Sequence, residues 1–230
     1  MLGDVYAETD RDRFRRRLLK YTRRAFKLLP RLEKPRIVDI GCGSGVPTVE
    51  LARLSDGEII GIDIDESLLE KLGRKIEEED LSDRVKTKKC SMFEIDFPDE
   101  SFDIIWAEGS ISTIGFERGL REWRRLLRAN GFLVVHDDNR NVPHKLETIP
   151  GCGYRLVKCF SLPKEAWWKE YYEPLEILLK KLRTKYKNNA DALEVLEKHQ
   201  KEIDLVRRNP EKYGSAFLVM QKSGTRGISA

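Results

Sequence analysis

Three glycines alternate with other residues at Gly41, Gly43 and Gly45, directly after the short apolar run RIVDI. Glycine lets the backbone turn with a positive φ and lets a ligand approach where a side chain would collide with it. Two carboxylates flank the cluster: Asp39 stands just before it, and Asp63 follows eighteen residues after its end, within GIDID. The pattern predicts a ligand-binding loop, although a simple strand-to-helix turn would use the same residues.

The spacing of this loop differs from that of a dinucleotide-binding loop. The fingerprint G-x-G-x-x-G requires a third glycine at position 46, where this chain has Val46. The pyrophosphate of a dinucleotide is also unfavourable beside a carboxylate, and Asp39 immediately precedes the loop. A cofactor with a cationic head group fits this arrangement better, unless Asp39 only caps the loop.

Two further titratable side chains lie at the ends of apolar runs. Glu108 follows SFDIIWA, and His136 lies in FLVVHDD. Ligands collect at the carboxyl ends of strands in open α/β sheets, so both are candidate catalytic residues. Glu108 can serve as a base, contact a cationic part of a cofactor, or pair with a nearby arginine. His136 can take a proton or be a structural histidine.

Aromatic residues recur at helical spacing in LPKEAWWKEYYEPLE, at Trp167, Trp168, Tyr171 and Tyr172. Such a face can stack on an aromatic substrate or hold a cationic one by cation–π contacts. We therefore take Trp167, Tyr171 and Tyr172 as candidate substrate-binding residues, together with Tyr21 of the first helix. Ordinary packing explains the same spacing and is the interpretation we prefer.

The charge of the chain is high but balanced. It has 43 Lys and Arg against 39 Asp and Glu, a net charge of +4. Residues 11 to 31 carry ten Lys or Arg and one Asp, so the first helix has a basic face. A solvated face is the usual meaning of such a run, and contact with RNA or another polyanion is the alternative.

Other sequence features limit where this protein works and what it binds. No run approaches 18 apolar residues, and the first residues lack the apolar stretch of a secretory signal, so we expect no membrane segment and a cytoplasmic location. The four cysteines occur singly, without a C-x-x-C pair. We therefore expect buried thiols and no metal site.

The elements that position these residues alternate along the chain. The expected strands are 36–40, 58–64, a weaker one at 84–92, 101–109 and 132–138. The expected helices are 10–29, 47–54, 66–81 and 118–131. This alternation predicts an α/β fold with a parallel sheet covered on both faces.

The alternation ends after Gly153. YRLVKCF and SAFLVMQK are typical of strands, and some fifty residues of helical pattern separate them. We predict an N-terminal helical lid at 1–30, a cofactor-binding domain at 31–162 and 214–222, a helical cap at 163–213 and a flexible tail at 223–230. We expect the lid and the cap to roof the substrate pocket.

The glycine loop D-I-G-C-G-S-G and the acidic end of GIDID together resemble the class I S-adenosylmethionine-dependent methyltransferases. FPDESFDIIWAEG and LLRANGFLVV are further landmarks of that family. The stretch IWAEGSISTIGFERGLREW is similar to a small-molecule-type subgroup whose substrates are mostly unassigned. The resemblance implies a Rossmann-like, doubly wound, mostly parallel seven-stranded sheet with an antiparallel last strand and a helical insertion before that strand.

The same resemblance implies S-adenosylmethionine as cofactor. The glycine loop would lie against its methionine and ribose, Asp63 would accept from both ribose hydroxyls, and Ser91 stands where many members have an adenine-binding Asp. The implied cofactor-binding residues are Asp39, Gly41, Cys42, Gly43, Gly45, Asp63, Ile64, Ser91, Met92, Phe93 and Glu108.

The implied reaction is in-line transfer of a methyl group to a small-molecule acceptor, leaving S-adenosylhomocysteine. Holding both reactants in line supplies much of the acceleration, so a base is needed only for protonated acceptors. An RNA- or protein-modifying methyltransferase steered by the basic first helix is the alternative, although AEGS stands where an NPPY-like tetrapeptide would be. A nucleotide-binding oxidoreductase is disfavoured by Val46. The acceptor and the oligomeric state do not follow from the sequence.

Overall fold

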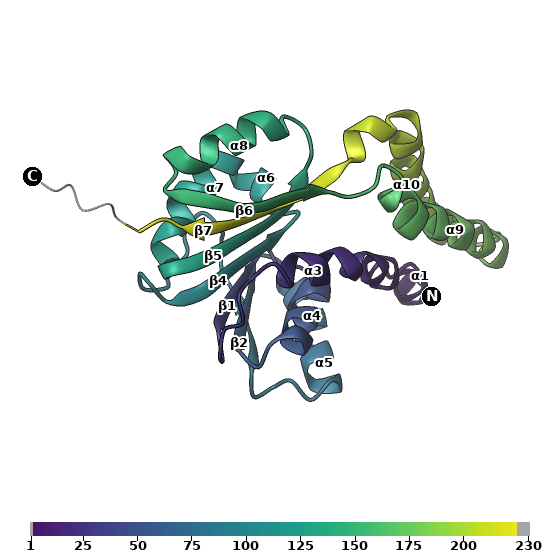
Figure 1. Cartoon of the computed structure of the whole chain (residues 1–230). Coiled ribbons are helices and arrows are strands. Elements are labelled where there is room, and N and C mark those ends of the chain that lie inside the picture. Colours follow the sequence, from purple (N-terminus) through teal and green to yellow (C-terminus); the bar gives the residue numbers. More distant parts are fainter. Residues whose placement is uncertain (1, 225–230) are drawn as a thin grey trace, which may run out of the picture. The chain divides into compact units, whose positions relative to one another are not determined.

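The computed structural model describes residues 2–224 and consists of two compact units (Figure 1). The helical unit contains the chain up to Lys20 together with Leu162–Gly214. The sheet unit contains Tyr21–Ser161 and the chain from Ser215 onward. Most of the tail expected at 223–230 lies outside the described residues, and the domain boundaries expected from the sequence stay predictions.

The sheet unit is built on seven strands in the order β3-β2-β1-β4-β5-β7-β6. The strands are β1 (Arg36–Ile40), β2 (Glu58–Asp63), β3 (Val85–Lys89), β4 (Phe102–Glu108), β5 (Leu127–Asp138), β6 (Tyr154–Ser161) and β7 (Ser215–Lys222). The pairs among β1 to β5 are parallel, and β7 runs antiparallel to both β5 and β6. The doubly wound, mostly parallel sheet with an antiparallel last strand is therefore confirmed.

Helices cover both faces of this sheet. They are α3 (Leu19–Phe26), α4 (Val46–Leu54), α5 (Glu66–Glu78), α6 (Ile111–Ile114), α7 (Phe116–Trp123) and α8 (Val142–Gly151). Figure 1 shows α3, α4 and α5 on one face and α6, α7 and α8 on the other. Strands buried on both faces are continuously apolar, as Ile104, Ile105 and Trp106 are in β4. The parallel order brings the carboxyl ends of β1, β2, β4 and β5 to one edge.

The helical unit is formed by two segments of the chain, one before the sheet unit and one between β6 and β7. Its elements are α1 (Leu2–Glu8), α2 (Asp12–Arg15), the 3-10 turn η1 (Arg16–Leu18), the π-helical turn η3 (Trp168–Tyr172), α9 (Glu173–Lys185), α10 (Ala190–Arg208) and the 3-10 turn η4 (Pro210–Tyr213). The insertion between β6 and β7 is thus helical, as predicted. Over residues 2–224, no helix is both long and apolar enough for a membrane span.

Several element boundaries differ from those expected. The first helix is broken into α2, η1 and α3, and α8 was not expected at all. The predicted helix 118–131 ends at Trp123, and β5 begins at Leu127 through a pairing with Phe102. Leu126 and Leu127 are both buried, so the run RRLLR satisfies the core equally as the end of a helix or the start of a strand.

Candidate functional site

The loop between β1 and α4 turns through three left-handed glycines. The φ angles of Gly41, Gly43 and Gly45 are 72°, 54° and 77°. The N–H groups of Gly41 and Cys42 both donate to the carbonyl oxygen of Ile62 at the end of β2, at 2.8 and 3.0 Å. The loop is thereby fixed against the neighbouring strand end, and a positive φ at these positions is strained for residues with a Cβ.

Two of these glycines are also required by their neighbours. A Cβ at Gly41 would lie 2.5 Å from the Cβ of Ser110, and one at Gly45 would lie 2.1 Å from Cδ1 of Leu72. At Gly43 the nearest atom, Cδ1 of Leu68, would be 4.0 Å away. Gly43 therefore has open space on its Cβ side, which is the side a ligand can use.

Asp63 is the last residue of β2, and its carboxylate connects the glycine loop to the loop between β2 and α5. Its Oδ2 accepts from the N–H of Gly43 at 2.8 Å, and its Oδ1 accepts from the N–H of Asp65 at 3.0 Å. A carboxylate has about four lone-pair positions, so these two bonds leave capacity for further donors such as hydroxyl groups. Asp65 is the N-cap of α5 and accepts from the N–H groups of Ser67 and Leu68, as the sequence suggested.

Asp39 and Cys42 lie deeper than Asp63. Oδ2 of Asp39 accepts from the hydroxyl of Thr48 at 2.6 Å, and this carboxylate is buried. Burial, followed by the negative charges of Asp39 and Asp63, raises the pKa of the Cys42 thiol far above its ordinary value. Cys42 therefore stays protonated and contributes a small apolar surface rather than a nucleophile.

Apolar side chains stand beside Asp63 at the same edge. Ile64 is 69% exposed and Phe93 is 43% exposed, both high for large hydrophobic residues. The chain after β3 is linked to β2 because the N–H of Cys90 donates to the carbonyl oxygen of Asp63 at 2.9 Å. Met92 is half-buried, and its Cε would lie 3.5 Å from a Cβ on Gly41. The hydroxyl oxygen of Ser91 accepts from the N–H of Phe93 at 3.3 Å.

Glu108 and His136 come together at the ends of β4 and β5. Oε2 of Glu108 lies 3.7 Å from Nδ1 of His136, and both side chains are at most 4% exposed. Oε1 of Glu108 accepts from the hydroxyl of Thr22 and from Nε1 of Trp106, each at 2.8 Å. Nε2 of His136 lies 2.8 Å from the hydroxyl oxygen of Ser215. The two candidate catalytic residues therefore belong to one buried polar network.

The aromatic candidates of the insertion form a cluster inside the helical unit. Tyr171 and Tyr172 are each 8% exposed, with their ring centroids 4.9 Å apart. Trp167 contacts both rings, and Phe14 meets Tyr171 edge to face. Tyr21 lies in the sheet unit, on α3, and is half-buried. The substrate-binding role of these four residues stays a prediction.

Several arginines of the basic first segment have partners within their own unit. Arg11 pairs with Glu202 at 2.6 Å, and Arg23 pairs with the buried Glu50 at 2.5 Å. The guanidinium groups of Arg15 and Arg24 lie over the rings of Trp167 and Phe160. These contacts reduce the number of cations on this segment that remain for a polyanion.

Three contacts of the site were missed at the sequence level. Ser110 donates its hydroxyl to the carbonyl oxygen of Ile40 at 2.5 Å, and Lys75 donates to the carbonyl oxygen of Ser44 at 2.6 Å. Thr22 is the third, through its bond to Glu108. The motif AEGS pointed toward Ser110, whereas nothing in the sequence pairs residues as distant as Thr22 and Glu108.

A methyltransferase-domain family model matches residues 38–135, which run from β1 to β5. This domain belongs to the class I S-adenosylmethionine-dependent methyltransferases. The match includes the glycine loop, Asp63 and Glu108, which lie at the carboxyl ends of β1, β2 and β4.

Relatives and solved structures agree with the methyltransferase domain. The 27-O-demethylrifamycin SV methyltransferase of Amycolatopsis mediterranei is 33% identical over 119 residues, covering 51% of this chain and 44% of that protein. The cyclase SpnF aligns with a TM-score of 0.75 at 19% identity, over 89% of this chain and 80% of that one. A Geobacter sulfurreducens S-adenosylmethionine-dependent methyltransferase in complex with S-adenosyl-L-homocysteine aligns with a TM-score of 0.72 at 18% identity. The alignment covers 87% of this chain and 90% of that one.

The curated relatives match about half of this chain, whereas the solved structures align with most of it. The chain spans less than half the length of the curated relatives it matches, so their whole activities are not carried over with the domain. The structural neighbours include a cyclase as well as a methyltransferase, and one fold serves both. The fold alone therefore does not define the function of this chain.

Proposed function

We propose that this protein is a methyltransferase that uses S-adenosylmethionine and acts on a small-molecule acceptor. The observation that carries the proposal is Asp63, whose carboxylate holds the open Gly43 and keeps lone pairs for further donors at the sheet edge. When bound, the cofactor supplies a methyl group on a positively charged sulfur. The rifamycin methyltransferase supports a small-molecule acceptor, because its name describes one.

The residues at the edge fit the parts of this cofactor. We assign the ribose hydroxyls to the carboxylate of Asp63. The adenine is assigned to the exposed side chains of Ile64 and Phe93, which offer apolar surface. The left-handed loop at Gly41 and Gly43 leaves backbone rather than side chains facing the ligand. The buried carboxylate of Asp39 adds negative charge beside a cationic ligand.

Glu108 and His136 are the groups we assign to proton transfer. Thr22 and Trp106 both donate to Glu108, and these two hydrogen bonds fix the orientation of its side chain. With a proton on Nδ1, His136 faces this carboxylate and can accept the hydroxyl proton of Ser215 on Nε2. An acceptor with an ionised nucleophile needs only positioning, whereas a protonated one needs this pair.

The proposal is tested by calorimetric titration with S-adenosyl-L-homocysteine. We expect binding to the wild-type protein and at least a tenfold loss in Asp63→Ala, which removes the ribose contact. Ile64→Ala is the cleaner variant, because a side chain that is 69% exposed contributes little to the core. We expect it to weaken binding several-fold, because each Å² of apolar area that the adenine no longer buries removes roughly 25 cal/mol from the binding free energy.

Two control variants accompany this titration. Asp65→Ala lies two residues from Asp63 but caps α5, so it should lower stability by about 1 kcal/mol and leave the affinity unchanged. Leu205→Ala removes another exposed hydrophobic side chain, 53% exposed, from the helical unit. If the wild-type protein does not bind S-adenosyl-L-homocysteine, the proposed function is wrong.

A further inference from the structure

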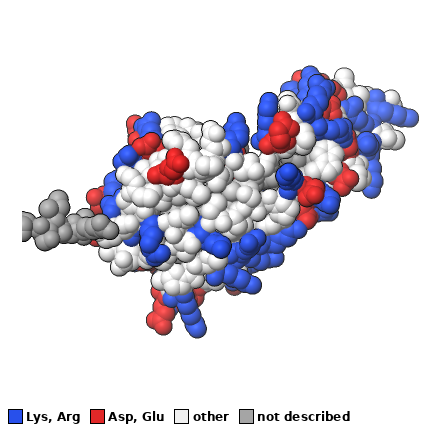
Figure 2. Space-filling model, turned by 45° about the horizontal axis from the view of Figure 1, so that its top comes forward, with Lys and Arg blue, Asp and Glu red and all other residues white. Residues whose placement is uncertain are grey.

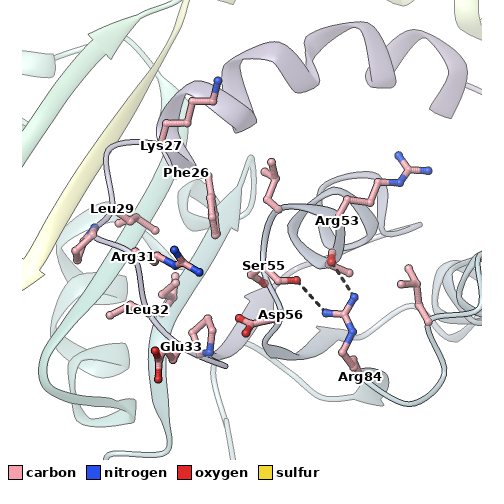
Figure 3. Close-up of a pocket in the computed structure, with 16 residues that line it drawn as sticks. Phe26, Lys27, Leu29, Arg31, Leu32, Glu33, Arg53, Ser55, Asp56 and Arg84 are labelled. Carbon is pink, nitrogen blue, oxygen red and sulfur yellow. Dashed lines mark hydrogen bonds between the residues drawn. The ribbon is translucent and has the colours of Figure 1, made fainter.

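A cavity of about 1000 Å³ lies in the sheet unit at the far end of α4 from the glycine loop (Figure 3). Residues of the α3–β1 connection, the last turn of α4, the approach to β3 and one residue of β4 line it. None of the candidate cofactor-binding residues is among its lining residues. Because α4 rises about 1.5 Å per residue, its nine residues separate the cavity from the glycine loop by roughly 13 Å.

The interior of this cavity is mainly apolar. Its hydrophobic side chains are Phe26, Leu29, Leu32, Leu54, Leu81 and Ile104. Figure 3 shows the ring of Phe26 directed into the space, with Leu29 and Leu32 along one wall. The volume is at the upper end of what small-molecule sites enclose, so an alkyl chain or a compact ring system can be accommodated.

Two of the arginines that line the cavity are already engaged. Arg84 donates to the carbonyl oxygens of Ala52, Ser55 and Gly57, at 3.0 to 3.2 Å, and thus closes the C-terminal end of α4 (Figure 3). Arg53 is paired with the carboxylate of Glu79, at 2.5 Å. Neither guanidinium group is therefore the anchor of a ligand.

Arg31 differs from these two. Within residues 2–224 its guanidinium group makes no hydrogen bond or ion pair. Figure 3 shows it reaching from the α3–β1 connection into the space below Phe26. Glu33 and Asp56 also line the cavity, and Asp56 accepts from the backbone N–H of Lys34 at 3.1 Å. Glu33 and Asp56 offset part of the positive charge that Lys27, Arg31 and Arg84 bring to the lining, so the cavity favours a ligand with a single negative charge over one with two.

We propose that this cavity binds an apolar carboxylate, a fatty-acid-like anion. Its hydrocarbon part lies against the leucines and Phe26, and its carboxylate pairs with Arg31. A planar guanidinium group matches the two oxygens of a carboxylate. The site is separate from the proposed methyltransferase site and does not depend on methyl transfer.

Decanoate, titrated below its micelle concentration, is the probe for this proposal. We expect saturable one-to-one binding to the full chain, at least tenfold tighter than that of decanol, which lacks the charge, and of decyl phosphate, which can carry two charges. Arg31→Gln should weaken decanoate binding about tenfold. Arg31 is exposed, so this variant should fold normally, and Arg208→Gln, an exposed arginine of the helical unit, is the matched control.

A second variant tests the apolar part of the site. Leu32→Trp narrows the cavity at the wall assigned to the hydrocarbon part and should weaken decanoate binding, whereas the affinity for S-adenosyl-L-homocysteine stays that of the wild-type protein. The proposal is overturned if decanoate does not bind below millimolar concentration, if Arg31→Gln binds it as well as wild type, or if S-adenosyl-L-homocysteine displaces it. A protein that binds decanoate but not S-adenosyl-L-homocysteine would refute only the proposed function.

Discussion

At the scale of single residues, the polar groups of the candidate site are held mainly by one another. Asp63 fixes Gly43 and the start of α5, and Glu108 accepts from Thr22 and Trp106. Such networks set the orientation of each carboxylate before a ligand arrives, which lowers the entropic cost of binding. The two carboxylates nevertheless differ in access, since Glu108 is almost fully buried.

This difference leads to a prediction that separates two roles of Glu108. If it works through His136, Glu108→Gln should bind S-adenosyl-L-homocysteine within about threefold of the wild-type affinity, because its carboxylate is occupied by protein donors. If Glu108 instead pairs with the cofactor's ammonium group, removing its charge should weaken binding tenfold or more. Calorimetry on the purified variant decides between the two roles.

His199 of the helical unit provides a pH-dependent prediction. Its Nδ1 lies 2.6 Å from Nη2 of Arg11, which can only donate, so the imidazole accepts and is neutral at this nitrogen. Burial, followed by the charge of Arg11, lowers the pKa of His199 below its ordinary value of 6.5. Below pH 6.5 the unfolded chain therefore binds a proton that the folded chain resists, and stability falls until the pH passes the lowered pKa.

The measurement for His199 is urea unfolding of wild type and His199→Gln between pH 7.5 and 5.5. The wild-type protein should lose stability over this range, and the variant should lose less. Because the unfolded state contains the other two histidines in both proteins, the difference between the two curves isolates His199. Parallel curves would show that this contact does not resist protonation.

At the scale of elements, the loop between β1 and α4 combines two requirements for glycine that can be tested apart. Gly45→Ala places a Cβ against Leu72 in addition to the left-handed strain, so we expect a loss of about 2–4 kcal/mol in stability. Gly43→Ala adds only the backbone strain of a left-handed alanine, so we expect it to lower stability by about 1 kcal/mol. It also puts a methyl group on the open side of the loop. We expect it to weaken S-adenosyl-L-homocysteine binding more than tenfold.

Gly73→Ala is the control for this pair. It lies inside α5 with nothing within 4 Å of its Cβ position, so alanine should raise stability by roughly 0.5–1 kcal/mol and leave binding unchanged. Equal affinities of Gly43→Ala and wild type would show that the ligand does not approach this part of the loop.

At the scale of the whole molecule, charge distribution matters more than the net charge of +4. Figure 2 shows Asp and Glu among the Lys and Arg side chains of the visible face. With Arg11 and Arg23 paired to Glu202 and Glu50, we expect RNA to be retained weakly at low salt and not at physiological salt. Filter binding over a salt series measures this, and a steep salt slope with tight binding would favour the RNA-modifying alternative.

Ligand-linked stability gives a second prediction at this scale. At a hundredfold excess over its dissociation constant, S-adenosyl-L-homocysteine should stabilise the fold by about 2.7 kcal/mol, which corresponds to several degrees in Tm. NAD should give no shift, because Val46 replaces the third glycine of a dinucleotide loop. Differential scanning calorimetry with each ligand measures both, and a shift with NAD alone would support the oxidoreductase alternative.

The sequence by itself determined the order of the strands along the chain and the edge at which the ligand loop lies. Apolar runs such as IIWA, the glycines of GCGSG and the N-cap at Asp65 are local signals, because burial, positive φ and capping depend on neighbouring residues. Boundaries such as Leu127 were missed, since a leucine pair satisfies a helix end and a strand start equally.

Only the tertiary structure decided which distant side chains meet. Glu108 meets His136 on the neighbouring strand and Thr22, which lies 86 residues earlier. Ser110 occupies the space that a Cβ at position 41 would need, so Gly41 is required there. The cavity around Arg31 likewise joins four separate segments of the chain. These contacts depend on strand order and register, which arise from the packing of the whole sheet and leave no periodicity in the sequence.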